Sequence, residues 1–205
     1  MSLFARYQQT DPAFPDQTDD VLAGNLCRCT GYAPIQKAAE SLRPSETHTG
    51  KFGGPVTLAA LKSIQPSRMT DSVYHDPNFE TERHYFAPRT EAELLDLLAQ
   101  HPDATLVAGA TDVGLWVTKQ HRLLQTTISL HQINQLQTME QDGADLRIGA
   151  MVRYSDAWAK LQSLHPDLGE LVRRLGSVQV RNSGTIGGNI ANGSPIGDMP
   201  PPLIA

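Results

Sequence analysis

Glycine occupies five positions within residues 184–198, and this segment limits the folds open to the chain. Ile186, Ile190 and Ile196 lie between the glycines. A flexible loop would be hydrophilic throughout, so the isoleucines predict a packed glycine loop. Its backbone N–H groups and polar side chains are left to bind a polar ligand. Those side chains are Thr185, Asn189, Asn192 and Ser194.

The glycine segment contains no Lys or Arg, so an anion bound there would be held by N–H dipoles. Asn192–Gly193–Ser194 matches a glycosylation sequon, but Pro195 follows it and we treat the match as chance. No Gly-x-Ser-x-Gly pattern occurs in the chain, so the sequence gives no support for a serine hydrolase.

Residues 106–113 are predicted to form the end of a strand, a tight turn and the start of a helix. Gly109 would let the backbone approach a ligand, and the N–H groups of residues 110–113 would suit a pyrophosphate. An ordinary strand–helix turn is the alternative. The segment lacks the G-x-G-x-x-G pattern, which excludes a Rossmann interpretation.

Cys27 and Cys29 are the only cysteines, and one residue separates them. A disulfide across so short a span would be strained, so metal or redox chemistry is favoured over a structural bridge. Two idle thiols are the alternative. Two thiolates are also only half of a four-ligand site, and the seven histidines offer no i,i+4 pair to complete one.

Composition narrows the class of protein. Gly and Pro together number 30, which favours a loop-rich α/β chain over a coiled coil or a helical repeat. A net charge of −5 argues against a nucleic-acid partner. No apolar run approaches the roughly 20 residues of a membrane span, and the N-terminus lacks the pattern of a signal peptide. The expected location is the cytoplasm.

Three units are predicted along the chain. Residues 1–43 form a helical unit, residues 44–78 a linker and residues 79–205 an α/β unit. The linker is rich in Pro and Gly and holds one short apolar stretch, Val56 to Ile64, which is expected to form a single helix.

In the helical unit, Leu3, Phe4 and Tyr7 predict a first helix. Thr18 is expected to cap a second helix, which Gly24 stops. A third helix is expected to start at Pro34. Its predicted inward residues are Ile35, Ala38, Ala39 and Leu42.

In the α/β unit, a strand is predicted from Tyr85, and Thr90 with Glu93 forms a capping box for the next helix. Thr105 to Ala108 is predicted as a buried strand. Ser155 is expected to cap a helix that runs through Leu161. The other predicted elements are a helix over 113–121, strands near 127–130, 136–140 and 146–148, and a helix over 168–175.

Residues 22–35, LAGNLCRCTGYAPI, resemble the iron–sulfur signature of the xanthine dehydrogenase/aldehyde oxidase family. The resemblance implies that Cys27 and Cys29 are two of the four ligands of a [2Fe–2S] cluster in a helical domain. In the family the other two ligands come from a Cys-Gly-x-Cys-Thr-Pro-Gly segment just before the position of Met1, so Met1 is expected to be an internal methionine of a longer protein.

Both glycine-containing segments resemble the FAD-binding domain of the same family in order and spacing. The implied fold is α+β: a partial all-α [2Fe–2S]-binding domain followed by the N-terminal part of a PCMH-type, vanillyl-alcohol-oxidase-like FAD-binding domain. Leu175 stands where the family often has an aromatic beside the flavin. The FAD-binding residues implied by the resemblance are Leu106, Val107, Ala108, Gly109, Ala110, Thr111, Asp112, Val113, Leu175, Thr185, Gly188, Asn189, Asn192 and Asp198.

The resemblance is closest to the bacterial small subunits that carry iron–sulfur and FAD domains on one polypeptide. It implies an oxidoreductase in which electrons leave a purine at the molybdenum cofactor of a large partner subunit. They pass through [2Fe–2S] clusters to FAD and then to NAD⁺. No catalytic base for purine hydroxylation is identified in this chain. The alternatives are a non-catalytic FAD-binding module, the flavin subunit of a related aldehyde or carbon monoxide dehydrogenase, and a zinc- or thiol-binding adaptor.

Overall fold

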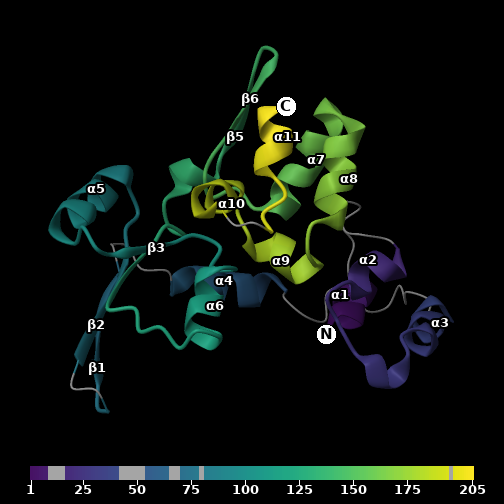
Figure 1. Cartoon of the computed structure of the whole chain (residues 1–205), viewed down its shortest axis with the longest axis horizontal. Helices are drawn as coiled ribbons and strands as arrows, with labels where there is room; N and C mark the ends of the chain where they lie inside the picture. The colour runs from purple at the N-terminus through teal and green to yellow at the C-terminus, as the bar shows by residue number, and fades with distance from the viewer. Residues whose placement is uncertain (9–16, 42–53, 65–69, 79–80, 194–195) are drawn as a thin grey trace.

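The computed structural model describes residues 1–8, 17–41, 54–64, 70–78, 81–193 and 196–205, and all structural statements here concern these residues. Helices and strands are mixed, which confirms the predicted α+β class (Figure 1). Residues 1–8 and 17–41 contribute helices and no strand. These are α1 (Ser2–Gln8), α2 (Thr18–Leu22), the 3₁₀ turn η1 (Arg28–Thr30) and α3 (Ala33–Ser41).

Glycine follows two of these N-terminal elements, and the sequence predicts the one at Gly24. Gly24 and Gly31 have φ values of +84° and +68°, the left-handed conformation that glycine adopts at low cost. The predicted cap at Thr18 is wrong. Gln17 holds the N-cap position, and the buried Thr18 hydroxyl instead accepts a hydrogen bond of 2.6 Å from Arg6 Nη1. A side-chain donor from α1 has therefore taken the oxygen that would have capped α2.

The third helix buries fewer of its apolar side chains than predicted. Ala39 is buried and Ile35 is half-buried, but Ala38 is exposed, so the prediction for Ala38 is wrong. The helix is short and only a narrow stripe of it meets other residues. The prediction for Leu42 lies outside the described residues.

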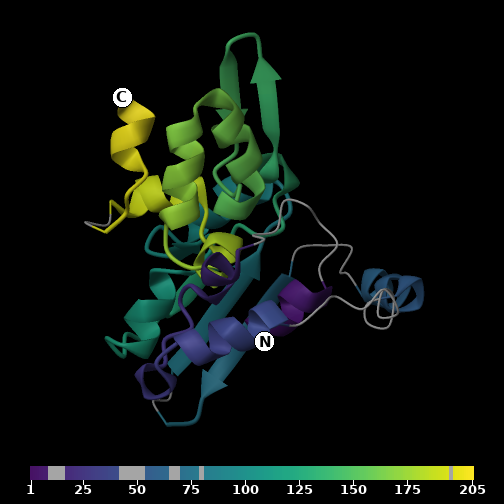
Figure 2. The same cartoon turned by 90° about the vertical axis from the view of Figure 1, so that its right-hand side faces the viewer.

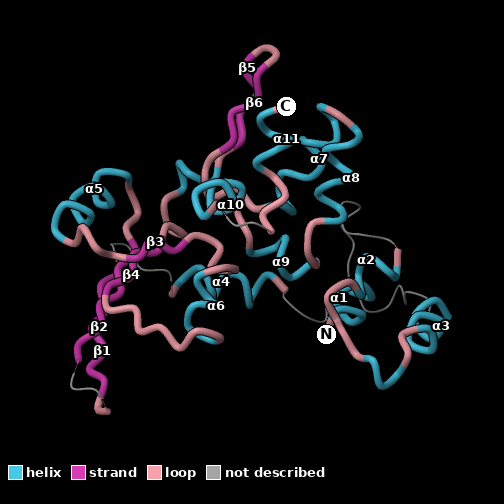
Figure 3. Tube along the Cα trace, viewed as in Figure 1, coloured by secondary structure: helices cyan, strands magenta, loops and turns pink. Residues whose placement is uncertain are grey.

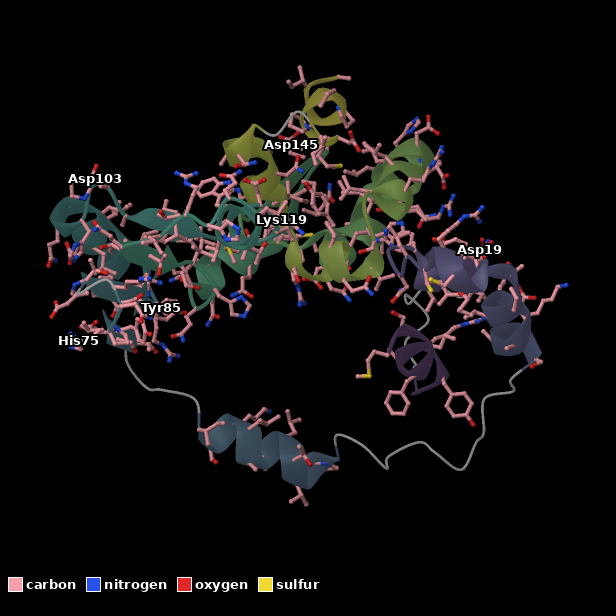
Figure 4. The ribbon with its side chains drawn as sticks, turned by 60° about the horizontal axis from the view of Figure 1, so that its bottom comes forward. Asp19, His75, Tyr85, Asp103, Lys119 and Asp145 are labelled. Atoms are coloured by element: carbon pink, nitrogen blue, oxygen red, sulfur yellow. The ribbon has the colours of Figure 1, made fainter. Side chains whose placement is uncertain are left out.

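The predicted linker contains both a helix and a strand. Helix α4 (Pro55–Ser63) confirms the expected helix, and its apolar side chains are exposed, including Val56, Leu58 and Leu61. Figure 4 shows α4 standing apart from the other helices and strands. Residues 70–76, placed in the linker from their sequence, instead form strand β1 (Thr70–Asp76). This strand pairs antiparallel with the next strand, residues 81–87, along its whole length, so it is the first arm of a hairpin that the composition of residues 44–78 did not indicate.

A four-stranded sheet has the order β1-β2-β4-β3 (Figure 3). Its other strands are β2 (Thr81–Ala87), β3 (Thr105–Val107) and β4 (Thr126–Ser129). Strand β1 is antiparallel to β2, whereas β2 and β3 both run parallel to β4. Helix α5 (Glu91–Gln100) covers the sheet, and Phe86, Leu97 and Ile128 form the core between them.

The strand over residues 105–107 is not buried as predicted. It lies at the sheet edge and pairs only with β4, so Leu106 is 43% exposed. A short apolar run does not reveal its place in a sheet, because strand order depends on distant partners. The chain then turns into α6 (Val113–Thr118), three residues shorter than the predicted helix.

The capping box before α5 is confirmed in part. Thr90 Oγ1 accepts from the backbone N–H of Glu93 at 3.2 Å. The Glu93 carboxylate accepts from the N–H of Arg89 at 2.7 Å, one residue before the expected Thr90. Both bonds still satisfy backbone donors at the start of the helix.

In the described residues from 134 onward, a 3₁₀ turn and a hairpin are followed by five helices; Figure 2 shows the hairpin beside these helices. The 3₁₀ turn η3 (Asn134–Gln137) precedes β5 (Met139–Asp142) and β6 (Asp145–Ile148). The helices are α7 (Tyr154–Leu164), α8 (Pro166–Arg174), α9 (Val178–Ser183), α10 (Ile186–Asn192) and α11 (Pro200–Ile204). A core centred on Tyr154, Leu161 and Val172 joins α7 to α8.

The predicted cap at Ser155 is wrong. Arg153 is the N-cap of α7, and the Ser155 hydroxyl donates to Asn182 Oδ1 of α9. The hydroxyl therefore links two helices instead of capping one.

Within the described residues, the N-terminal helices contact the C-terminal half. Arg173 of α8 and Asp20 of α2 form an ion pair at 2.7 Å. Gln179 Nε2 donates to Ser2 Oγ at 3.2 Å. Gly24 packs so closely that a Cβ there would lie 2.3 Å from the Cβ of Ser177. In the part of the chain that the structure describes, no helix is long and apolar enough to cross a membrane.

Candidate functional site

A cavity of about 620 Å³ lies where the loop after β3 meets the segment around α10. Parallel strands present ligand sites at their carboxyl ends, and this cavity follows the carboxyl end of β3. Thirteen of the fourteen predicted FAD-binding residues line it; Val107, within β3, does not. The thirteen are Leu106, Ala108, Gly109, Ala110, Thr111, Asp112, Val113, Leu175, Thr185, Gly188, Asn189, Asn192 and Asp198.

The first wall is the turn between β3 and α6. Ala110 has a φ of +58°, and its carbonyl accepts from Gly114 N–H at 2.8 Å, which starts the helix. Among the described residues, no hydrogen-bond acceptor is found for the N–H groups of residues 110–113. These free donors at the start of a helix are suited to an anion, as the sequence predicts.

The second wall is a helix, which corrects the predicted glycine loop. Residues 186–192 form α10, and Thr185 Oγ1 caps it by accepting from Gly188 N–H at 3.1 Å. The two N–H groups that precede Gly188 also have acceptors. Ile186 N–H donates to the carbonyl of Val152, and Gly187 N–H donates to the carbonyl of Ala150. Acceptors from before α7 thus stabilise a helix that its glycines disfavour.

The free donors are therefore divided unequally between the two walls. Asn189 N–H bonds the Thr185 carbonyl, so all four N–H groups of residues 186–189 are occupied. The predicted anion site on N–H dipoles of the glycine segment is wrong for these residues. The turn at residues 110–113 carries the free N–H groups, while α10 supplies side chains. Ser194 lies outside the described residues.

The glycines bring backbone segments together. Gly109 packs against the backbone of Ser183, and Gly187 packs against Ala150, where a Cβ would lie 2.6 Å from the Ala150 Cα. Gly109 thus allows close contact between the two walls, and because it also lines the cavity, its role of admitting a ligand stays a prediction. Close packing of main chains positions both walls of the cavity.

Tyr154 lines the cavity and was not predicted as a site residue. Its side chain is buried, and its hydroxyl has no hydrogen-bond partner among the described residues. Burial, followed by the nearby Asp198 carboxylate, raises the pKa of the phenol above its usual range. Asn189 Oδ1 is likewise buried without a partner on the same cavity. Two unsatisfied polar atoms therefore stand at one site.

Arg181 stabilises the wall of the cavity that carries Leu175. This arginine was not predicted from the sequence as a site residue. The guanidinium is buried and its Nη1 donates to the carbonyls of Arg173, Leu175 and Gly176 at 2.9–3.4 Å. Burial lowers the pKa of Arg181, an effect opposed by the charge of Asp20. The arginine thereby closes the C-terminal end of α8 and fixes the turn that places Leu175 beside the cavity.

Cys27 and Cys29 do not line the cavity. They lie at η1, where Cys27 is partly and Cys29 fully exposed. Hydrogen bonding from the Thr30 side chain is the main cause of a lowered pKa at Cys27. Among the described residues, no three His, Cys, Asp or Glu side chains come together in a way that could hold a metal. The two thiols form a half-site with access to solvent.

The sequence of the chain is similar to those of known proteins. Residues 77–205 match the family described as FAD binding domain in molybdopterin dehydrogenase. The whole chain is 29% identical to the xanthine dehydrogenase of Drosophila subobscura and 28% identical to the xanthine dehydrogenase/oxidase of Mus musculus. It covers 18% of each, so it spans less than a fifth of these curated relatives.

Solved structures give a second comparison. The cyanide-inactivated Cu,Mo-CO dehydrogenase is 30% identical, with a TM-score of 0.53 over 57% of this chain and 42% of that one. A carbon monoxide dehydrogenase from Hydrogenophaga pseudoflava is 33% identical, with a TM-score of 0.51 over 54% of this chain and 40% of that one. Both similarities cover only part of this chain.

Proposed function

Since the chain belongs to the family of FAD-binding domains in molybdopterin dehydrogenases, we propose that it holds FAD within an electron-transfer unit of the xanthine dehydrogenase type. In this proposal, electrons come from purine oxidation at the molybdenum cofactor of a large partner subunit. They travel through [2Fe–2S] clusters to FAD and leave on NAD⁺.

The observation that carries this proposal is the shared cavity. Residues from β3, the turn before α6, the end of α8 and α10 surround one space of about 620 Å³. That volume lies in the range of about 300–1,000 Å³ typical of ligand sites. Free N–H groups at one wall and unpartnered polar atoms at another fit a ligand with both phosphate and hydroxyl groups.

The residues of the cavity have separate tasks in this proposal. The N–H groups of residues 110–113 would hold the pyrophosphate of FAD, because they point from a helix start and have no other acceptor. Asn189 would accept a hydrogen bond from the ligand. Leu175 gives an apolar surface without an aromatic ring. When bound, FAD would supply the redox chemistry, and these residues position it and exclude water.

We further propose that Cys27 and Cys29 supply two ligands of a [2Fe–2S] cluster. Two thiolates one residue apart on an exposed turn suit soft iron, and Thr30 lowers the pKa of Cys27, which favours the ligating thiolate form. Four ligands are needed, so this half-site requires two more from outside the 205 residues.

The alternative of a carbon monoxide dehydrogenase flavin subunit is favoured by the structural similarity to two such enzymes. That similarity covers 57% or less of the chain. The similarity to xanthine dehydrogenases extends over all 205 residues and includes the Cys27–Cys29 segment. We therefore place the electron-transfer unit of the xanthine dehydrogenase type first.

FAD titration of the 205-residue chain, followed by flavin fluorescence, tests the proposal. Gly188→Ala and Gly114→Ala form a matched pair. A Cβ at Gly188 would lie 2.7 Å from Thr185 Oγ1, whereas a Cβ at Gly114 meets nothing within 4 Å. We expect saturable binding that weakens in Gly188→Ala and survives in Gly114→Ala. Absence of saturable binding by the wild-type chain would refute the cavity as an FAD site.

A further inference from the structure

Tyr154 carries a polar group that the protein itself leaves unused. The side chain is 2% exposed, at the first position of α7, and its Oη has no partner among the described residues. Burying a hydroxyl without a hydrogen bond is unfavourable, so a native structure that retains one calls for a reason. Tyr154 also lines the cavity, which places a possible partner there.

The backbone holds Tyr154 in place at the junction of the two walls. Its N–H donates to the carbonyl of Gly184 at 3.2 Å, beside the antiparallel bridge between Arg153 and Thr185. A Cβ at Gly184 would lie 3.6 Å from both Tyr154 Cδ2 and Thr111 Oγ1. The phenol ring therefore lies near the turn with the free N–H groups.

Asn189 supplies the complementary unsatisfied atom. Four buried side-chain polar atoms lack a partner in the described part of the chain, and only those of Tyr154 and Asn189 line this cavity. At neutral pH the phenol is protonated and can donate a hydrogen bond, whereas Asn189 Oδ1 is an acceptor. A ligand hydroxyl both accepts and donates, so a chain of hydroxyls could satisfy both atoms.

We propose that Tyr154 is an FAD-binding residue whose hydroxyl donates a hydrogen bond to a ribityl hydroxyl oxygen. The ribityl chain joins the flavin to the pyrophosphate, and Tyr154 lies beside Thr111 on the turn that would hold that pyrophosphate. This inference rests on the proposed binding of FAD. It adds a residue that local sequence did not mark and assigns it one part of the ligand.

Tyr154→Phe tests the inference because it removes the hydroxyl and keeps the ring. We expect the Kd for FAD to rise about five- to tenfold, while the ligand-free chain stays as stable as the wild type or becomes more stable. Tyr85→Phe is the control, since Tyr85 is exposed on β2 away from the cavity. A packing role alone would leave the Kd for FAD unchanged in Tyr154→Phe, and that result would overturn the inference.

ADP separates the ribityl contact from a phosphate contact, because ADP has the adenine and pyrophosphate of FAD but no ribityl chain. We expect Tyr154→Phe to leave the Kd for ADP unchanged, and an equal loss for ADP and FAD would overturn the ribityl assignment. If the wild-type chain binds FAD and Tyr154→Phe binds it equally well, only this inference fails. If the wild-type chain does not bind FAD, the proposed function fails as well.

Discussion

Gly109 and Ser183 lie in backbone contact, so that a Cβ on residue 109 would stand 2.0 Å from the carbonyl oxygen of Ser183. The contact joins the turn after β3 to the end of α9, two segments separated by most of the C-terminal half. The same Cβ would lie 2.9 Å from the Cα of Gly184. Both obstacles are main-chain atoms, which cannot rotate away as a side chain can. The two walls of the cavity can therefore approach this closely because residue 109 is a glycine and has no side chain.

Replacing Gly109 with Ala should force these walls apart. We expect a loss of about 1–3 kcal/mol in the free energy of unfolding, the usual cost of overpacking. The Kd for FAD should rise about tenfold or more, because each 1.4 kcal/mol of lost contact costs a factor of ten. Urea unfolding and FAD titration measure the two effects.

Gly114→Ala is the control for this change, since it adds the same methyl group to α6 in open space. Ala also favours a helix over Gly, so this variant should be unchanged or slightly more stable. Equal stability and equal FAD affinity in Gly109→Ala and Gly114→Ala would show that the contact with Ser183 has no energetic weight.

Local patterns predicted two ligand-binding segments, and the resemblance to a known family implied the individual FAD-binding residues. The run LVAGATDV marks a strand, a turn and a helix start, and the glycine spacing marks the second wall. Thirteen predicted residues accordingly meet at one cavity. No local pattern showed that Gly109 would contact Ser183, because that contact depends on the tertiary fold.

The wrong structural predictions share one physical cause: each depends on contacts with residues that are distant in the sequence. Residues 186–192 read as a loop because glycine disfavours helices, yet carbonyls of Ala150 and Val152 satisfy the first N–H groups of α10. The position of β3 at the sheet edge likewise depends on its pairing with β4. Tyr154 stood just before the helix predicted to start at Ser155, and its unpaired hydroxyl is visible only in the folded structure.

The ion pair between Asp20 and Arg173 should help to dock α2 on α8. Arg173 also pairs with Glu170 of its own helix, which offers a matched comparison on one guanidinium. The Asp20 side chain is 15% exposed and that of Glu170 is 51% exposed. Double-mutant cycles should give a larger coupling of Arg173 to Asp20 than to Glu170, because exposed ion pairs are weak.

Hydrogen exchange provides a second measurement of this docking. Asp20→Asn should speed exchange in α2, whereas Glu170→Gln should not. If both carboxylates couple equally to Arg173 and neither variant changes exchange, the docking role of the ion pair is wrong.

The 205-residue chain should not assemble a stable [2Fe–2S] cluster by itself. Such a cluster needs about four protein ligands, and Cys27 and Cys29 are the only cysteines. Anaerobic reconstitution followed by iron and sulfide analysis is the measurement, with Cys27→Ser/Cys29→Ser as the control. Iron and acid-labile sulfide near two each per wild-type chain, absent from the control, would contradict this prediction.

Tyr154 should make the chain lose stability at alkaline pH. Burial and the charge of Asp198 raise the pKa of its phenol above the usual value of about 10. The unfolded chain therefore releases this proton as the pH passes about 10, while the folded chain keeps it, so the free energy of unfolding falls as pH rises. The stabilising contribution is complete below pH 10 and decreases above it, by at most about 1.4 kcal/mol per pH unit. Tyr154→Phe lacks this proton, so its unfolding free energy, measured in urea from pH 9 to 11.5, should fall less steeply than that of Tyr85→Phe. Equal slopes in the two variants would mean that the folded chain releases the Tyr154 proton as readily as the unfolded chain does.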